Sequence, residues 1–355
     1  MIGKKIGISA GSIHKLLFIE EHQPELLKII DMGDITINGA FTETKRHLNL
    51  ISLSEYVSKR KKDIPLNIEN LTIYNKSSED MSDVENDSVQ TIVTSLPYYQ
   101  KRSYLVDSQI GLEKSMDEHL SRLMTVMRES KRVLKEDGSM FLVIGDSYDE
   151  RGSLRQVPHR LSLAMSDDGW ILRNTLVWHK LNAKPENGKI KRWGTSYEFI
   201  FFFTLSTNYY FNMDKVRVPY LTEFSSGTHR HYEIYEKNNM RQQQMSIHHP
   251  LGRVPRDFIV DDVVQTTLNN SDKFVPDKNL EHSATFPEKL IKPFILGTSI
   301  EGDTILDPFL GSGTTAKVSL DNGRKCIGYE ISTAFVDTRY QRCAELKYLE
   351  SSKVV

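Results

Sequence analysis

Cysteine is almost absent from this sequence, which contains only Cys326 and Cys343 among 355 residues. Two cysteines cannot form a disulfide framework in so long a chain, so we expect a reducing compartment, the cytoplasm. Long hydrophobic runs are missing as well. A stretch such as 199–203 is typical of a buried strand and is far too short to cross a bilayer. The first residues also lack the apolar core of a signal peptide, and we expect no association with a membrane.

An excess of charge of one sign is missing too, because 46 Lys and Arg stand against 47 Asp and Glu, a net charge of −1. No overall basicity indicates nucleic-acid binding, so such a function must be argued from local patches and motifs. The 15 Phe, 15 Tyr and 3 Trp exclude disorder over most of the chain. The length of 355 residues predicts one large domain with one or two smaller pieces.

The first zone of the chain, 1–62, has helical spacing and no strong strand. A cap at Ser9–Ser12 precedes apolar residues at helical spacing, and further helices are expected at Gln23–Met32 and Thr36–Leu48.

The second zone alternates strands and helices, which predicts an α/β sheet covered on both faces. The expected strands are Leu71–Tyr74, Gln90–Leu96, Ser139–Gly145, Trp170–His179, Tyr197–Leu205, Thr304–Phe309 and Lys325–Glu330, with a turn at Asp137–Gly138. The expected helices are Met116–Leu134, Arg155–Asp167, Phe286–Leu296, Gly313–Leu320 and Thr333–Leu349.

The third zone, about 206–256, interrupts this alternation. Its Lys and Arg outnumber its Asp and Glu, so it is locally basic although the whole chain is not. It also holds four histidines without a cysteine or carboxylate partner at clear ligand spacing, so we expect no metal site. These are His229, His231, His248 and His249.

A glycine-rich turn, Asp307–Thr315, follows one expected strand and opens a helix. Gly311 and Gly313 allow a tight turn and a close approach to a ligand, and the helix N-terminus offers N–H groups. Glu330 ends the next strand, where a carboxylate can accept hydrogen bonds from ribose hydroxyls. The combination predicts a nucleoside-containing cofactor. The turn is no P-loop, because Gly-Lys-Ser/Thr is missing, and taken alone it is also compatible with a purely structural role.

A second motif, Thr94–Tyr99, ends the strand expected before it. Pro97 holds Leu96 in an extended conformation, so that the Leu96 carbonyl can face a pocket beside the Ser95 hydroxyl. Two oxygen acceptors next to the ring of Tyr98 suit a planar ring that bears an amino group. In isolation the segment is equally a plain strand-ending turn.

Together the two motifs resemble those of the amino-methylating DNA methyltransferases, which use S-adenosylmethionine. Ser95–Tyr98 is similar to the family's Ser/Asp/Asn-Pro-Pro-Tyr catalytic motif, and Phe309–Gly313 to its Phe-x-Gly-x-Gly cofactor motif. The catalytic motif comes first and the basic zone lies between the two, an order that resembles the β class. The resemblance covers about 71–349, including 182–185, Arg192, Ser196–Glu198, 251–257 and 282–290. It implies a circularly permuted Rossmann-like methyltransferase sheet.

The resemblance also implies site residues and needs no metal. Ser95 and Leu96 would accept hydrogen bonds from the target amino group, and Tyr98, after Pro97, would stack on the base. Leu96 stands where the family has its first Pro, but the position contributes its backbone carbonyl, which Leu retains. No residue is assigned to the adenine of the cofactor, because Ser77 stands where many relatives have Asp. The implied cofactor residues are Phe286, Pro287, Asp307, Phe309, Gly311, Gly313 and Glu330.

The first residue of the catalytic motif indicates the target base. Ser95 resembles the enzymes that methylate cytosine N4, whereas Asp or Asn more often accompanies adenine N6, which we keep as the alternative. Methylation of cytosine C5 is disfavoured, because it needs a cysteine nucleophile and Cys326 is expected to fill apolar space inside a strand. An amino group buried in base pairing is reached only by flipping the base out of the duplex.

Two segments are expected to contact DNA. The basic zone 206–256 is the natural target-recognition insert, with a solvated peripheral loop as the alternative. The N-terminal residues 4–16 resemble a helix-turn-helix, and 24–40 are similar to the segment after that motif in ParB-like partition proteins. The helix at Ser12 would then enter the major groove, and a helical packing module is the alternative.

The chain therefore divides into a helical module, 1–62, a catalytic half, 63–205, a target-recognition insert, 206–256, and a cofactor-binding half, 257–355. The expected partners are double-stranded DNA and a cognate restriction endonuclease, although an orphan methyltransferase is equally compatible. Monomer and homodimer stay open. An RNA methyltransferase and a non-catalytic DNA-binding protein are the alternatives from other classes, and loss of cofactor binding would favour the latter.

Overall fold

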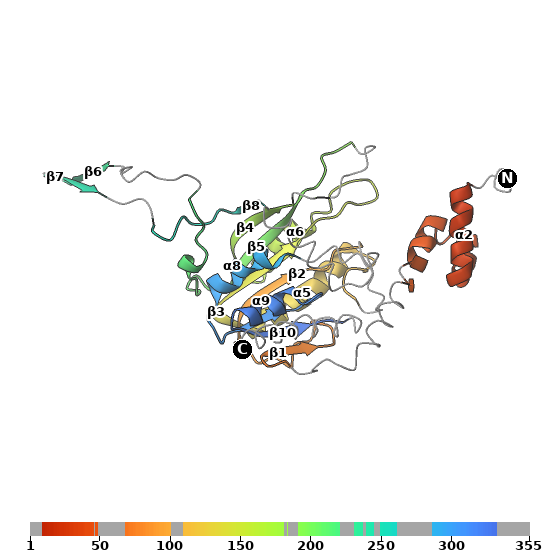
Figure 1. The fold of residues 1–355 in the computed structure, drawn as a ribbon, viewed down its shortest axis with the longest axis horizontal. Coiled ribbons are helices and arrows are strands. Elements are labelled where there is room, and N and C mark those ends of the chain that lie inside the picture. Colours follow the sequence, from red (N-terminus) through yellow and green to blue (C-terminus); the bar gives the residue numbers. More distant parts are fainter. Residues whose placement is uncertain are drawn as a thin grey trace, which may run out of the picture.

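The computed structural model describes residues 9–45, 47–48, 68–100, 109–180, 183, 191–220, 231–236, 239–244, 249–260 and 286–331. Eight strands form one sheet in the order β1-β10-β9-β2-β3-β5-β4-β8 (Figure 1). Every neighbouring pair is parallel except those that contain β5, which runs against both β3 and β4. The strands are β1 Leu71–Tyr74, β2 Val89–Ser95, β3 Leu134–Ile144, β4 Ile171–His179, β5 Tyr197–Thr204, β8 Phe258–Val260, β9 Thr304–Asp307 and β10 Lys325–Tyr329.

The strand order reverses between β9 and β2. The chain continues from β9 to β10 on one side of this pair and reaches β3 on the other side after β2. In open α/β sheets, ligands bind outside the carboxyl ends of the strands at such a point. Ser95 ends β2 and Asp307 ends β9. Both sequence motifs therefore leave the sheet at the position where a ligand is expected.

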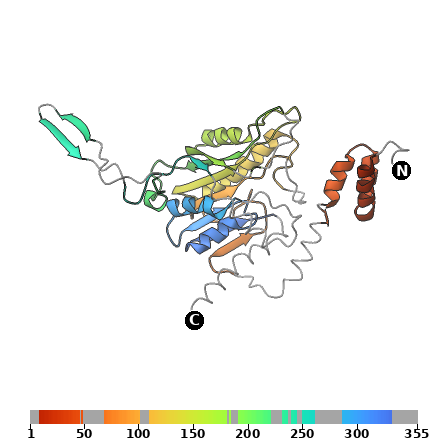
Figure 2. The same cartoon turned by 45° about the horizontal axis from the view of Figure 1, so that its top comes forward.

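Helices cover both faces of the sheet (Figure 2). Side chains alternate along each strand, so Ile92 of β2 packs in the cluster that contains α5 and α6, and Val93 packs in the cluster that contains α8 and α9. The predicted two-sided α/β architecture is confirmed. The helices are α5 Met116–Val133, α6 Val157–Asp167, α8 Glu288–Thr298 and α9 Thr314–Asp321.

The predicted turn at Asp137–Gly138 is wrong as a break before the strand. β3 already begins at Leu134, and the pairing with β2 jumps from Val89↔Leu134 to Thr91↔Ser139. Between these two pairings β3 has more residues than β2. Asp137 and Gly138 therefore lie in a bulge inside a longer strand.

Helix α8 starts at Glu288, later than expected, because Pro287 is its extended N-cap with ψ 149°. The helix predicted at Thr333–Leu349 lies outside the described residues.

The N-terminal module is helical, as predicted. Helix α2 spans Ala10–His22, with the Ser9 hydroxyl accepting from the N–H of Ser12, and helix α3 spans Glu25–Asp31. Residues 37–45 are also helical. Ala10 and Gly11, which belong to the predicted cap, lie inside α2, and residues 4–8 of the helix-turn-helix resemblance lie outside the described residues. DNA contact by this module stays a prediction.

The insert contains a short 3-10 helix, η1 Met213–Lys215, and a two-stranded antiparallel sheet of β6 His231–Glu236 and β7 Asn239–Gln244. A bridge between Val218 and Arg253 joins its two ends. Its role in target recognition stays a prediction. No helix in the described part of the chain combines the length and the apolar character that a membrane span requires.

Candidate active site and cofactor loop

The predicted catalytic residues form a continuous turn at the end of β2. Leu96 still donates its N–H to Val143 of β3, at 3.1 Å, so the turn starts from a fixed strand position. The Leu96 side chain is 2% exposed and belongs to the core, whereas Ser95, Pro97 and Tyr98 are partly exposed. The leucine that stands where the similar motif has its first proline is therefore accommodated by burial of its side chain. The Ser95 hydroxyl makes no hydrogen bond to any other described residue.

The two tyrosines of this turn have different surroundings. Tyr98 donates its hydroxyl to Glu198 Oε1, at 2.5 Å. Tyr99 is 4% exposed, and its ring lies between His119 and the guanidinium of Arg155. Tyr98 is thus partly exposed with its hydroxyl engaged, and Tyr99 is a core residue.

The loop that is predicted to bind the cofactor, called the cofactor loop below, comprises residues 308–313 between the end of β9 and the start of α9. Gly311 has φ +50° and Gly313 has φ +81°, conformations that favour glycine. Phe309 and Gly311 are partly exposed, whereas Leu310 is buried against Gly328, where a Cβ atom would lie 2.5 Å from Leu310 Cδ2. The loop therefore presents backbone and one aromatic ring outward while anchoring itself through Leu310.

Glu330 lies beside this loop, as the sequence predicts. Its Oε2 atom accepts the N–H of Gly311 at 3.0 Å, and its backbone carbonyl accepts from the amide of Asn75 at 2.7 Å. The carboxylate is partly exposed, which fits a second role towards ribose hydroxyls. Phe286 and Pro287 are both buried, and the ring of Phe286 packs in the core cluster of α8. Their contact with the cofactor stays a prediction.

Asp307 is the residue that fastens the two motifs together. It is 1% exposed, and its Oδ1 accepts the Thr94 hydroxyl at 2.6 Å and the Phe309 N–H at 3.0 Å. Its Oδ2 accepts the Thr315 hydroxyl, also at 2.6 Å. Both oxygens are thus engaged within the protein. The geometry makes Asp307 a support of the cofactor loop, and direct cofactor contact stays a prediction.

Asp307→Asn is expected to remove a loss of stability that wild type shows as the pH rises from about 4 to neutral. Burial raises the pKa of Asp307 to about 6, although hydrogen bonds from Thr315 and Thr94 oppose the shift. Because this pKa exceeds the ordinary 3.8, the folded state holds the proton more tightly than the unfolded chain. The stabilising contribution is complete below about pH 4 and is lost as the pH rises through about 6. The variant should gain about 2–3 kcal/mol over wild type between pH 4 and pH 7.

Urea unfolding at a series of pH values measures this difference. Asp214→Asn is the matched control, because the Arg217 guanidinium holds the pKa of Asp214 below its ordinary value. The control should therefore show the opposite sign, with stability lost at neutral pH. A pH-independent difference for Asp307→Asn would contradict the prediction.

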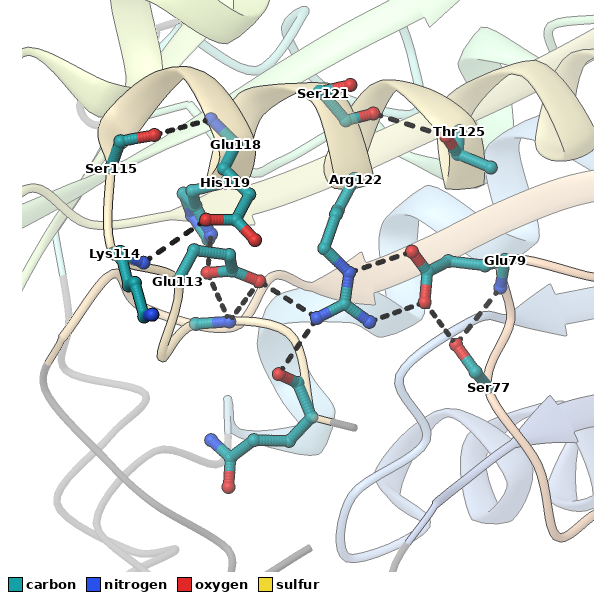
Figure 3. Close-up of polar contacts among 12 residues, drawn as sticks. Ser77, Glu79, Glu113, Lys114, Ser115, Glu118, His119, Ser121, Arg122 and Thr125 are labelled. Atoms are coloured by element: carbon teal, nitrogen blue, oxygen red, sulfur yellow. Dashed lines mark hydrogen bonds and ion pairs between the residues drawn. The ribbon is translucent and has the colours of Figure 1, made fainter. Parts of the chain in front are cut away.

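A cluster of charged residues that the sequence did not predict joins the loop after β1 to the segment before α5 (Figure 3). Arg122 of α5 binds Glu79 through two hydrogen bonds, of 2.9 and 2.6 Å, and Glu113 through one of 3.1 Å. Glu79 follows β1, beside Ser77, whose hydroxyl donates to it at 2.9 Å. Glu79 is therefore paired with Arg122. No local sequence motif predicts this contact.

Glu113 connects the cluster to residues 95–98, the catalytic turn, through Gly111. Both its oxygens accept the N–H of Gly111, at 3.1 and 2.9 Å. Gly111 has φ +113°, and a Cβ atom there would lie 3.0 Å from the Tyr98 carbonyl oxygen. The Gly111 carbonyl accepts the N–H of Gln100, at 2.7 Å. Arg122 thus supports, through Glu113, the segment that packs on Tyr98.

Comparison with known proteins adds a family match. The model of the N6/N4 DNA methylase family matches residues 89–341. The type II methyltransferase M.Cfr9I of Citrobacter freundii is 34% identical over 283 residues, which cover 72% of this chain and 81% of the relative. The orphan methyltransferase M.BamHII of Bacillus amyloliquefaciens is 30% identical, over 72% of this chain and 88% of its own.

A solved structure shares the fold. The PvuII DNA methyltransferase, whose name describes it as cytosine-N4-specific, aligns with a TM-score of 0.57 and 20% identity. The alignment covers 79% of this chain and 89% of that one. At this identity the likeness concerns the fold, and it agrees with the eight-stranded α/β sheet described above.

Proposed function

The chain belongs to the N6/N4 DNA methylase family, and we propose that it transfers a methyl group from S-adenosylmethionine to the exocyclic N4 atom of cytosine in duplex DNA. The observation that carries the proposal is the position of Ser95. It ends β2 at the reversal of strand order, next to the cofactor loop that Thr94 and Asp307 tie to the same strand. A serine here resembles the enzymes of this family that act on cytosine N4.

The cofactor is S-adenosylmethionine, and the residues present fit it. The loop at Gly311 and Gly313 has backbone that a ligand can approach closely, and Glu330 beside it is a partly exposed acceptor for hydroxyl groups. When bound, the cofactor supplies a methyl group already activated as a sulfonium. The protein therefore has to position the nucleophile, and positioning lowers the barrier substantially.

The nucleophile is the target amino group, which is weak because its lone pair is delocalised into the ring. We propose that Ser95 Oγ and the Leu96 carbonyl accept its two hydrogens, which favours a tetrahedral nitrogen whose lone pair points at the methyl group. Tyr98 stacks on the base after it has left the duplex. The amine loses one proton to solvent after the transfer.

The biological setting that we propose is restriction–modification, since M.Cfr9I is named a type II methyltransferase. The name of M.BamHII, an orphan methyltransferase, describes the other setting. Both require recognition of a short DNA sequence, which we assign to the insert between the two halves.

Product analysis tests the proposal. The protein is incubated with S-adenosylmethionine and unmethylated genomic DNA, the DNA is digested to nucleosides, and the methylated nucleoside is identified by mass spectrometry. We expect N4-methylcytosine confined to one short sequence. N6-methyladenine would keep the family and overturn the interpretation of Ser95. Methylation of RNA in place of DNA would overturn the substrate.

A further inference from the structure

The hydroxyl of Tyr98 is held by a second group of residues, which come from β5 and from the end of β4. Tyr98 donates to Glu198 Oε1 at 2.5 Å, and the same carboxylate forms an ion pair with Lys180. The Glu198 side chain is 12% exposed and that of Lys180 is 27% exposed. A carboxylate so far removed from water is stable where a cation and a hydrogen-bond donor satisfy it.

The reversed strand brings these residues together. β5 runs against β3, so its first residues lie at the edge of the sheet where β3 ends, and Phe199 pairs with Ile144. Glu198 pairs with Trp178 near the end of β4, and Lys180 follows that strand. The Lys180 N–H also donates to the Ser196 carbonyl, at 2.7 Å. The carboxylate therefore has fixed supports on two strands.

Gly145 fixes the edge of the same ring. It follows β3, and a Cβ atom built on it would lie 2.7 Å from Tyr98 Cε1 and 3.3 Å from Glu198 Cγ. The absence of a side chain at this position lets the Tyr98 ring lie against the backbone. The ring is thus restrained at its edge by Gly145 and at its hydroxyl by Glu198, two contacts that determine its plane.

We propose that Glu198 is a positioning residue for methyl transfer, which holds the Tyr98 ring through its hydroxyl in the plane that stacks on the flipped base, with Lys180 holding the carboxylate in place. The inference rests on the proposed function, and within it on Tyr98 as the stacking platform. Glu198 belongs to a segment that resembles the family without an assigned role.

The chemistry gives the carboxylate a role in the transition state as well. As the amino lone pair forms the new N–C bond, the C–S bond breaks with its electrons going to sulfur, and the base carries positive charge until the amine releases a proton to solvent. A phenol that donates to a carboxylate has a more electron-rich ring, and an electron-rich ring attracts a cationic base more strongly. Loss of Glu198 should therefore lower kcat more than it raises KM for DNA.

Four proteins test the proposal: wild type, Glu198→Gln, Tyr98→Phe and the double variant. We expect each single variant to lower kcat by roughly 10-fold, because each removes one charge-assisted hydrogen bond. The double variant should be no slower than either single one, since both changes break the same contact. Glu129→Gln is the matched control, because Glu129 forms a comparable, partly exposed ion pair with Arg132 at 2.8 Å on α5. The control should keep wild-type kcat.

If the fold reductions in kcat of the two single variants multiplied in the double variant, the proposal would be overturned. An unchanged kcat in Glu198→Gln would overturn it as well. Thermal unfolding of the same four proteins gives a double-mutant cycle in the free energy of unfolding. The coupling energy between the two side chains in this cycle does not depend on activity. Absent coupling in unfolding would overturn the proposal even if wild type methylated no DNA. A methylated adenine as the product would overturn the proposed target base. The kcat values of the four proteins would still decide the role of Glu198.

Discussion

Ser95→Ala is expected to lower kcat for methyl transfer by roughly 10²–10³-fold, with little change in stability or in cofactor affinity. The reason is that the Ser95 hydroxyl is one of two acceptors proposed to orient the amino group. A lost acceptor at a preorganised site acts mainly on the transition state, where the nitrogen becomes tetrahedral. Because the side chain is partly exposed and makes no hydrogen bond to any other described residue, its removal disturbs no observed contact of the fold.

Single-turnover kinetics with saturating cofactor and DNA measures this effect. Ser139→Ala is the matched control, because Ser139 lies on the neighbouring strand β3, opposite Thr91 at the other end of β2. Its hydroxyl is buried without a hydrogen-bond partner among the described residues, so the control should keep full activity. A wild-type rate in Ser95→Ala would show that the amino group is oriented by other atoms.

The candidate site could be located from the sequence because both motifs are local. Glycines after a strand, and a proline that fixes the residue before it, determine backbone conformation within a few positions. The alternation of strands and helices, also a local pattern, predicted an α/β sheet covered on both faces. The strand order places Ser95 and Asp307 together, and the contact between Thr94 and Asp307 joins residues 213 positions apart.

The supports of the site were not predictable in this way. The contact of Tyr98 with Glu198 spans 100 residues, and that of Arg122 with Glu79 spans 43. Each residue taken alone is an ordinary charged side chain, whose usual place is a solvated surface. Only the reversed direction of β5 brings Glu198 to the catalytic edge, and the residues of a single strand do not specify its direction.

Arg122→Met is expected to destabilise the protein by about 3–5 kcal/mol, the largest effect on stability among the variants considered. Arg122 neutralises Glu113, whose side chain is 2% exposed. Burial lowers the pKa of His119, the other basic group in contact with Glu113, so its ring is uncharged at neutral pH. Without the guanidinium, the buried Glu113 side chain has no cation beside it among the described residues.

Thermal unfolding measures the loss, which corresponds to a fall in Tm on the order of 10 °C. Arg128→Met is the matched control on the same helix. Arg128 pairs with Asp168 at 2.8 Å, but its side chain is 62% exposed, so the control should lose less than about 1 kcal/mol.

The double variant Arg122→Met, Glu113→Gln separates two causes of the loss. If the buried charge of Glu113 dominates, removing that charge should restore much of the stability, because an amide can still accept the N–H of Gly111. If lost packing dominates, the double variant should be as unstable as Arg122→Met. Recovery of stability would also restore the support of Gly111 beneath Tyr98, and methyl transfer should recover with it. A stable double variant that stays slow would show that Arg122 acts on the catalytic turn by another route than Glu113.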